Sequence, residues 1–350
     1  MRNIYFIRHG EPDFPAGKHM CLGKTDLPLS KLGRLQAVLA GAQLADRKLT
    51  VFSSPLLRAR QTAEAFGTPI TILEDLRELD MGQWDGLTFD EIRSRFPELY
   101  AARATDRTLP FPDAEDRRDG LVRFRGAITQ ALSMCSGDIA IITHSGVMEL
   151  LFHTQSKAPY GSFTHIEEDR NMFTVRAFGS VPHPALDRAL CEKLLDAAKT
   201  PENVVRHCRT VSQKAADLAQ PLLKAGYPLD TRLIEVGALL HDIARTEDFH
   251  AQRGAWYFEK LGYSEIARLI RSHCDCSGKE LNEEAIVFLA DKLTLHTSSV
   301  TLQERFEKSR KKCRTEEEKY YHNARYAAAL KIFALYENAV SSCCENVPAS

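Results

Sequence analysis

An arginine and a histidine stand together directly after the first apolar stretch of the chain. The stretch is residues 4–7 (IYFI), and Arg8, His9, Gly10 and Glu11 follow it. An imidazole can act as a nucleophile, and an arginine beside it can bind an anion through charge-assisted hydrogen bonds. The pattern therefore suggests nucleophilic attack on an anionic group. A strand end that simply carries two polar residues would look the same.

The surrounding elements predict how these side chains are presented. The β-branched and aromatic residues at 4–7 are typical of a buried central strand, and Gly10 ends it so that Arg8 and His9 emerge at its carboxyl end. Open α/β sheets place their sites at that edge. Strands and helices then alternate, which predicts a mostly parallel sheet in an α/β three-layer sandwich. We expect strands near 49–52, 70–73 and 138–143, helices over 31–45 (N-capped by Ser30), 56–63, 88–104, 119–135 and 147–153, a loop over 74–86, and a hairpin over 161–178.

Four segments of this half resemble the motifs of one known family. The segments IRHGE (7–11), SSPLLRARQTA (53–63), ELDMGQWDG (78–86) and THSG (143–146) look like the four motifs of the histidine phosphatase (phosphoglycerate-mutase-like) superfamily, in the family's order. The resemblance implies that residues 1–180 form a phosphoglycerate-mutase-like domain. It also implies phosphoryl chemistry that requires no metal or other cofactor in this domain.

The resemblance gives five side chains a role. His9 would attack phosphorus and carry the phosphoryl group as phosphohistidine, which divides one difficult displacement into two easier ones. Arg8 and Arg58 would bind the phosphoryl oxygens, and His144 would donate to the developing charge. Glu78 would protonate the leaving oxygen as the general acid. Taken singly, Arg58 could lie on an exposed helix face, Glu78 in a solvated loop, and His144 in the core with its hydrogen bonds satisfied.

One position departs from the family pattern. An asparagine often follows the nucleophile there as a phosphate ligand, whereas residues 12–18 of this chain read PDFPAGK. Thr25 or Lys18 could take its place in substrate binding. The loop over 81–91 leads straight into a helix, which looks more like phosphatases, including α-ribazole-phosphatase-like members. A mutase must hold its product under a more closed lid, so hydrolysis is predicted and a mutase is the alternative.

The chain changes character after a linker at 181–185. From 186 to 340 the apolar residues recur at helical spacing, which predicts an all-α bundle. A carboxylate such as Asp291, placed inside an apolar helical run, is costly to bury without a partner. Imidazoles and carboxylates that converge from several helices build dinuclear metal sites in bundles. The polar residues placed in this way are His207, His241, Asp242, His273 and Asp291.

This ordered set resembles the HD-domain phosphohydrolases, and most closely those related to bacterial diadenosine-tetraphosphate hydrolases. Two further histidines extend the site to two metals in that group, and His250 and His273 would correspond to them. The resemblance implies a metal-dependent phosphohydrolase that acts on a nucleotide or related phosphoester. Its nitrogen and oxygen ligands favour iron or manganese, and zinc is also compatible. The implied metal ligands are His207, His241, Asp242, His250, His273 and Asp291.

Three alternatives stay open for this second half. His250 could be a surface residue, and His207 could serve only in helix packing. The HD domain could also sense a nucleotide and regulate the phosphatase without catalysis. Cys274 and Cys276 lie just after His273. We expect them to be buried or idle thiols and not metal ligands, because the HD residues already complete the coordination of the metals. Residues 341–350 are predicted to form a flexible tail.

Composition limits the partners of the protein. Lysine and arginine number 46 and aspartate and glutamate 47, so bulk nucleic acid is a disfavoured partner. No apolar run is long enough to span a membrane, the first residues do not resemble a signal peptide, and the nine cysteines form no disulfide framework. We therefore expect a cytoplasmic, bifunctional phosphohydrolase that acts on small phosphorylated metabolites or nucleotides away from the membrane. Oligomerisation is left open.

Overall fold

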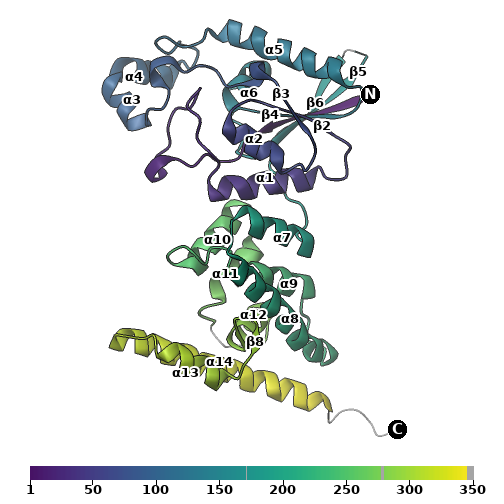
Figure 1. Cartoon of the computed structure of the whole chain (residues 1–350), viewed down its shortest axis with the longest axis vertical. Coiled ribbons are helices and arrows are strands. Elements are labelled where there is room, and N and C mark those ends of the chain that lie inside the picture. The colour runs from purple at the N-terminus through teal and green to yellow at the C-terminus, as the bar shows by residue number, and fades with distance from the viewer. Residues whose placement is uncertain (171, 277–279, 345–350) are drawn as a thin grey trace. The chain divides into compact units, whose positions relative to one another are not determined.

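The chain forms two compact units, and each is described by itself. The computed structural model describes residues 1–170, 172–276 and 280–344 (Figure 1). The first unit spans Met1–Pro184, and the second begins at Ala185. None of the helices within these ranges is long and apolar enough to cross a bilayer.

The first unit is built on a six-stranded sheet with the order β3-β2-β4-β1-β5-β6. β1, β2, β3 and β4 run parallel, and β5 and β6 form the antiparallel edge. The parallel register pairs Arg8 with Thr143, so His9 and His144 leave neighbouring strands at the same edge. The strands are β1 (Arg2–Arg8), β2 (Thr50–Ser53), β3 (Ile70–Ile72), β4 (Ile139–Thr143), β5 (Phe163–Asp169) and β6 (Met172–Ser180).

Helices cover both faces of this sheet, and the alternation of side chains along β1 decides which face each residue joins. Ile4 and Phe6 pack in one core with residues of α5 (Arg117–Met134) and α6 (Ser145–Leu151). Tyr5 and Ile7 point to the other face and pack with residues of α1 (Lys31–Gln43) and α2 (Leu57–Glu64). Because both faces are buried, residues 4–7 of β1 and 139–142 of β4 are all apolar, as expected for central parallel strands.

The ends of most helices lie close to the predicted positions, with one correction. The Ser30 side chain caps α1 by accepting a hydrogen bond from the Gly33 amide. The single helix predicted over 88–104 is wrong, because the structure contains two helices there, α3 (Phe89–Arg95) and α4 (Pro97–Thr105). Pro97 disfavours helical geometry at the residue before it, and Phe96 has φ −133° and ψ 54°. Proline suits the first position of the new helix, where its missing N–H costs nothing.

Among the residues that the structure describes, the regular structure of the second unit is helical apart from one small hairpin, β7 (Thr294–Leu295) with β8 (Ser298–Ser299). Its central element is α12, in which residues 285–292 are all buried. Asp291 and Lys292 therefore lie inside the core and must pair their charges there. The helices are α7 (Arg188–Ala197), α8 (Glu202–Lys224), α9 (Thr231–Leu240), α10 (His250–Lys260), α11 (Ser264–Ser272), α12 (Glu283–Lys292), α13 (Leu302–Arg310) and α14 (Glu316–Cys344).

The C-terminal end of the bundle differs from the prediction in one respect. Helix α14 continues to Cys344, so the flexible tail expected from residue 341 begins at least four residues too early. The remainder of that predicted tail, 345–350, lies outside the described residues.

Candidate functional site

The first candidate site lies where β1 and β4 end. The His9 amide donates to the Thr143 carbonyl at 3.0 Å, and the ring centroids of His9 and His144 are 5.0 Å apart. Gly10 allows the chain to turn here against α1, because a Cβ at this position would lie 2.2 Å from the Gly33 carbonyl oxygen. The Gly10 amide donates to the Thr62 hydroxyl at 3.0 Å, which fixes the turn.

His9 is held as a neutral nucleophile. Its Nδ1 lies 2.7 Å from the Gly10 carbonyl oxygen, which can only accept, so Nδ1 carries the proton and Nε2 keeps its lone pair. Burial, followed by the positive charges of Arg58 and Arg8, lowers the pKa of His9 well below its usual value. The imidazole is therefore uncharged at neutral pH and able to attack.

Two arginines flank His9: Arg58 is buried, and Arg8 is half-buried. Arg58, on α2, donates to the carbonyls of Thr25 and Gly23 at 2.9 Å each. Arg8 donates to the Ala158 carbonyl, and its guanidinium carbon lies 3.8 Å from the ring centroid of Tyr160. These contacts orient both guanidinium groups, and Asp26 adds an ion pair to Arg58 at 3.8 Å.

Three buried donors beside His9 have no hydrogen-bond partner among the described residues. They are Nε of Arg8, Nε of Arg58 and Nδ1 of His144. Buried donors without partners are costly, so their accumulation at one place indicates a ligand that accepts from them. A tetrahedral anion that meets His9 has the acceptor oxygens that these donors lack. Nε2 of His144 is 2.7 Å from the Ser54 hydroxyl, and Nδ1 is the donor in the tautomer in which that hydroxyl donates to Nε2.

Glu78 is bound at the amino terminus of α6. Its Oε1 accepts from the amides of Leu79 and Val147 at 3.0 Å each, and its Oε2 accepts from the Gly146 amide at 2.9 Å. A Cβ at Gly146 would lie 2.6 Å from Oε1, so this glycine makes room for the carboxyl group. Burial raises the pKa of Glu78 above its usual value in spite of these bonds. A raised pKa suits a carboxyl group that must donate a proton.

Five predicted site residues lie together in the structure. Thr25 and Lys18, the candidate substitutes for the missing asparagine, have other contacts. Arg8, His9, Arg58, Glu78 and His144 share one buried site. The Thr25 hydroxyl donates to Asp85 at 2.9 Å, and the Thr25 carbonyl accepts from Arg58, so this residue orients the arginine. Lys18 is exposed, and its positive charge is one of the smaller causes that lower the pKa of Glu91 in α3.

Sequence reasoning missed two neighbours of the site. Ser54 follows the end of β2 just as His9 follows β1, and that shared position was an available signal. Tyr160 lies under Arg8, and its ring centroid is 5.7 Å from that of His9. It belongs to an irregular segment before β5, and no pattern in the sequence indicates it.

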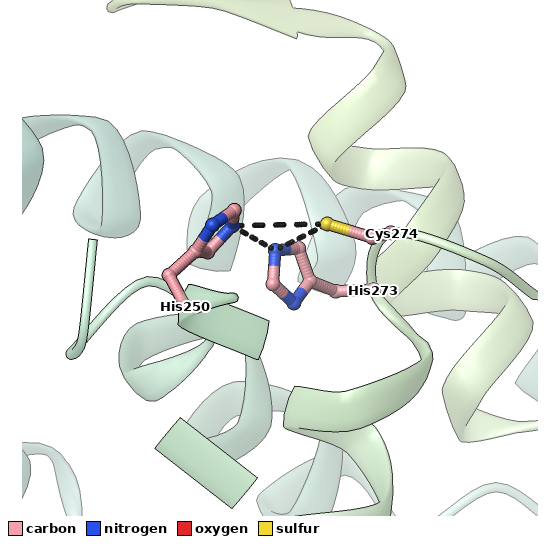
Figure 2. A group of neighbouring side chains, drawn as sticks. All are labelled: His250, His273 and Cys274. Atoms are coloured by element: carbon pink, nitrogen blue, oxygen red, sulfur yellow. Dashed lines mark hydrogen bonds between the residues drawn. The ribbon is translucent and has the colours of Figure 1, made fainter. Parts of the chain in front are cut away.

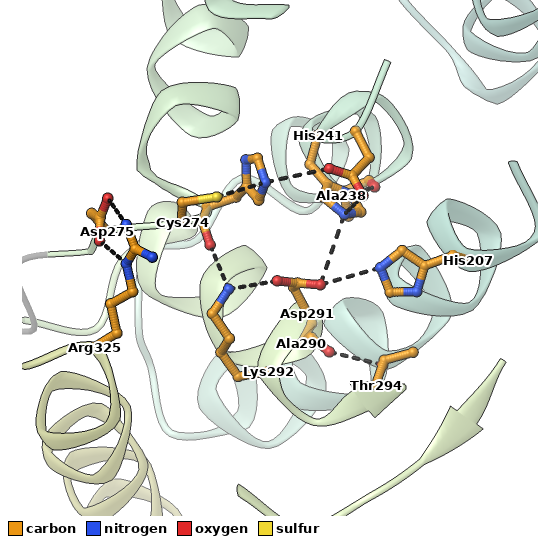
Figure 3. A network of polar contacts seen from close by, with 12 residues as sticks. His207, Ala238, His241, Cys274, Asp275, Ala290, Asp291, Lys292, Thr294 and Arg325 are labelled. Carbon is orange, nitrogen blue, oxygen red and sulfur yellow. Dashed lines mark hydrogen bonds and ion pairs between the residues drawn. The ribbon is translucent and has the colours of Figure 1, made fainter. Parts of the chain in front are cut away.

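The second candidate site lies inside the helical unit, where the six predicted metal ligands converge. Figure 3 shows three of them, His207, His241 and Asp291. His207 comes from α8 and Asp291 from α12, whereas the others stand at helix ends. Among the described residues, three ligand atoms lie mutually within 4.8 Å in each of three overlapping groups. The groups are His207 with His241 and Asp291, His241 with Asp242 and His273, and His250 with His273 and Cys274.

Three of these imidazoles are fixed in the same tautomer by backbone carbonyls. Nδ1 of His207 lies 2.8 Å from the His296 oxygen, Nδ1 of His241 2.7 Å from the Ala238 oxygen, and Nδ1 of His273 2.6 Å from the Ile270 oxygen. Each Nδ1 therefore donates, and each Nε2 is the nitrogen that faces the centre, where it would bind a metal in its deprotonated form. Histidine ligands of metals are oriented by this kind of second hydrogen bond.

The donor set fits a divalent transition metal. Nε2 of His241 and Oδ1 of Asp242 are buried and have no hydrogen-bond partner among the described residues. Nε2 of His250 and of His273 lie 3.3 and 3.5 Å from that same Asp242 oxygen. Neutral imidazoles and carboxylates are ligands for iron, manganese and zinc, and the orphaned atoms are the ones that a metal would satisfy.

The charges of the second site are strongly coupled. Burial alone would raise the pKa of Asp291, but Lys292, whose Nζ is 2.6 Å from Oδ2, and His207 hold it well below its usual range. Burial lowers the pKa of His241 to about 4. For His273, burial is outweighed by Asp242 and Cys274, which raise its pKa to about 10. Metal binding at His273 must therefore displace a proton.

Cys274 lies closer to this site than the sequence suggests. Its Sγ is 3.2 Å from Nε2 of His273 and 3.7 Å from Nε2 of His250 (Figure 2). Burial raises its pKa, but hydrogen bonds from the two histidines prevail and bring it to about 5. Cys276, by contrast, packs against the apolar core of the bundle. The expectation of an idle thiol at Cys274 therefore does not match its surroundings.

Comparisons with known proteins identify both units. Residues 4–177 match the histidine phosphatase superfamily (branch 1), and residues 204–295 match the HD domain. The glucosyl-3-phosphoglycerate phosphatase of Mycobacterium tuberculosis is 30% identical over 176 residues, which cover 46% of this chain and 78% of that protein. Its namesake in Mycolicibacterium vanbaalenii is 41% identical over 124 residues, which cover 34% of this chain and 55% of that protein.

A solved structure of a mycobacterial glucosyl-3-phosphoglycerate phosphatase complexed with VO3 aligns with a TM-score of 0.47 at 26% identity. The alignment covers 51% of this chain and 100% of that chain. From the family matches, the chain belongs to the histidine phosphatase superfamily and carries an HD domain after the phosphatase domain. It is a hydrolase that acts on phosphoester bonds, and the predicted families and fold class are confirmed.

Proposed function

We propose that the first unit is a phosphomonoesterase that works through phosphohistidine at His9. The second unit is proposed to be a metal-dependent phosphohydrolase that acts on a nucleotide or related phosphoester. The observation that carries the first proposal is the set of three unpaired buried donors, on Arg8, Arg58 and His144, around a neutral imidazole.

The first half of the reaction is a displacement at phosphorus. Nε2 of His9 forms the N–P bond while the bond from phosphorus to the ester oxygen breaks. The unpaired N–H groups of Arg8, Arg58 and His144 bind the phosphoryl oxygens, and they act more strongly here than in water because the site is buried. Glu78 gives its proton to the departing alkoxide.

The position of that proton follows from the hydrogen bonds of Glu78. Each carboxyl oxygen has two lone pairs, and both of those on Oε1 are used by backbone amides. Within the described part of the chain, Oε2 accepts only from Gly146 and therefore keeps a position for the proton. In the second half, the deprotonated Glu78 takes a proton from water as the water oxygen attacks phosphorus and the N–P bond breaks. His9 then returns to its neutral state, and inorganic phosphate leaves.

The substrate of the first unit is proposed to be the phosphomonoester of a small polar metabolite. Two relatives at 30% identity or above are named for glucosyl-3-phosphoglycerate, which is a sugar acid phosphate. A compound of that class, with a phosphate on a sugar or hydroxy-acid carbon, is the first to be assayed. Hydrolysis is preferred to mutase chemistry because the same two relatives are named phosphatases.

The test of the first proposal is direct trapping of the intermediate. Full-length protein is mixed with substrate labelled at phosphorus, quenched with alkali, and examined for acid-labile, alkali-stable label on His9. We expect label in the wild type, no label in His9→Ala, and normal labelling in His153→Asn, which changes an exposed histidine. Phosphate release by His9→Ala at the wild-type rate would overturn the mechanism. Transfer of label to a second position of the product would identify a mutase.

In the second unit, the proposed metal ligands are His207, His241, Asp242, His250, His273 and Asp291. A divalent metal pair bound there supplies Lewis-acid polarisation of a phosphoryl oxygen. The protein's own part is to fix its ligands: carbonyls hold the Nε2 atoms inward, and Lys292 orients Asp291. Phe249 is 82% exposed and precedes His250, so its ring is available to stack on a base. This supports a nucleotide as substrate.

The test of the second proposal uses the full chain with the first site silenced. His9→Ala protein, loaded with iron or manganese, is expected to hydrolyse nucleotides, and the double variant with Asp242→Ala is expected not to. Nucleotide binding without hydrolysis in the metal-loaded His9→Ala protein would instead identify the HD domain as a sensor. If nucleotide cleavage yields a monophosphate that only the His9 site removes, the two units act in sequence.

A further inference from the structure

We propose that Cys274 is itself a metal ligand, which adds sulfur to the nitrogen and oxygen donors at one end of the HD centre. The assignment rests on the metal site proposed above and deepens it. The sulfur would bind the same ion as Nε2 of His250 and Nε2 of His273, and Oδ1 of Asp242, which lies near both imidazoles, would be the fourth donor.

The distances between the donor atoms match those of ligands around one ion. With zinc–sulfur and zinc–nitrogen bonds of about 2.3 and 2.05 Å, tetrahedral geometry separates sulfur from nitrogen by about 3.6 Å and two nitrogens by about 3.3 Å. Sγ of Cys274 lies 3.2 and 3.7 Å from Nε2 of His273 and of His250. The two nitrogens are 3.3 Å apart (Figure 2). All three separations agree with these values to within about 0.4 Å.

A fourth donor at this place is independently short of a partner. Oδ1 of Asp242 is buried without a hydrogen bond from any described residue, and it lies 3.3 Å from Nε2 of His250 and 3.5 Å from Nε2 of His273. These separations are again close to the distance of about 3.3 Å between neighbouring ligands of one tetrahedral ion. Nη1 of Arg245 is 3.6 Å from the same oxygen, so its charge is also balanced at the surface side of the site. The carboxylate, two imidazoles and a thiol side chain together supply enough donors for a site.

The segment that carries Cys274 is tied on both sides. Before it, Nζ of Lys292 donates to the His273 carbonyl at 3.0 Å. After it, Asp275 accepts from Arg325 of α14 at 2.5 and 3.1 Å (Figure 3). These contacts hold the chain in an orientation that brings the sulfur to the histidines. A thiolate is a softer ligand than a carboxylate, so it shifts the preference of this position from manganese toward zinc or iron.

The experiment uses cobalt(II) as an optical probe of sulfur coordination. Full-length protein is stripped of metal, reloaded with cobalt(II), and measured for bound metal and for the near-ultraviolet thiolate-to-cobalt charge-transfer absorption. We expect this absorption in the wild type and in Cys276→Ser, whose cysteine packs in the apolar core. We expect its loss in Cys274→Ser, with zinc affinity reduced about tenfold or more by competition with a chelator.

Two outcomes would overturn the assignment at different levels. Cobalt bound by the wild type without the charge-transfer absorption, or the absorption retained in Cys274→Ser, would refute sulfur ligation and leave the HD metal site intact. If the wild type binds no cobalt, zinc, iron or manganese, the proposed metal site fails together with it. Far-ultraviolet circular dichroism of each variant shows that lost absorption does not result from unfolding.

Discussion

Substitution of Glu78 by glutamine separates its proposed role in catalysis from its role in the structure. The amide oxygen can take the place of Oε1 and keep the bonds from Leu79 and Val147, both at 3.0 Å. The amide NH2 then faces the Gly146 N–H, which is 2.9 Å from Oε2 in the wild type. One hydrogen bond is lost and two donors oppose each other, which we expect to lower the free energy of unfolding by about 1–3 kcal/mol.

The catalytic effect of the same substitution depends on the leaving group. A general acid contributes about 10²- to 10⁴-fold, which corresponds to about 3–5 kcal/mol of transition-state stabilisation. We expect Glu78→Gln to lower kcat/KM by that factor for an alkyl phosphate, whose alkoxide needs a proton. For a nitrophenyl phosphate the loss should be less than about tenfold, because nitrophenolate leaves without protonation.

The assay compares the two substrates on wild type and variant under identical conditions, with thermal unfolding as a control for folding. An equal loss for both substrates would refute general-acid catalysis, since it would mean that Glu78 only positions the amino terminus of α6. The burst of phosphohistidine formation provides a second criterion. With the alkyl phosphate it should slow in Glu78→Gln, because protonation belongs to the first displacement.

The remaining predictions concern pH, packing, metal and base binding. Burial raises the pKa of Glu78, so kcat/KM should fall as pH rises through that pKa, and Glu78→Gln should remove this alkaline decline. Because the pKa of His9 is lowered, activity should persist at pH values below 6.5. Gly146→Ala places a Cβ 2.6 Å from Oε1 of Glu78, and we expect it to reproduce the leaving-group pattern of Glu78→Gln. Chelation of metal should lower the Tm of the second unit and leave that of the first unchanged, as followed by calorimetry. Phe249→Ala should raise KM for nucleotides about 10-fold with kcat unchanged, since stacking of a base contributes about 1–3 kcal/mol.

Each of these predictions has an outcome that contradicts it. An alkaline decline that persists in Glu78→Gln would belong to another group, and normal alkyl phosphatase activity in Gly146→Ala would mean that α6 adapts. If chelators shift one thermal transition that includes both units, the prediction that metal stabilises the second unit alone would be wrong. For Phe249, the control is Phe249→Tyr, which retains the ring and should retain the wild-type KM; an equal rise of KM in both variants would exclude stacking.

Much of the fold followed from the sequence because local chemistry specifies it. The apolar runs at 4–7 and 139–142 can be buried on both faces only as central strands, and they are β1 and β4. Ser30 caps α1 as its residue type predicts. The break at Pro97 was also encoded locally, since proline restricts the residue before it, but the helical spacing on both sides concealed it.

The candidate sites divide in a similar way. His9 beside Arg8 suggested nucleophilic attack on an anion, and the resemblance to the histidine phosphatase motifs added Arg58, Glu78 and His144. Polar residues inside apolar helices indicated a metal centre, and the resemblance to HD-domain phosphohydrolases added His250 to its ligands. These inferences required residue identity and periodicity together with the resemblance to two known families.

Only the tertiary structure decided which atoms meet and how they are charged. Glu78 accepts from the Gly146 amide at the start of α6, 68 residues further along the chain. His144 contacts Ser54, which is 90 residues away from it in the sequence. The lowered pKa of His9 arises from burial and from Arg58, neither of which a local pattern contains. Cys274 is adjacent to His273 in sequence, yet its place beside His250 depends on how α10 and α11 pack. Distances and dielectric surroundings are set by packing between remote segments, so the sequence specified the chemical groups and the fold specified their geometry.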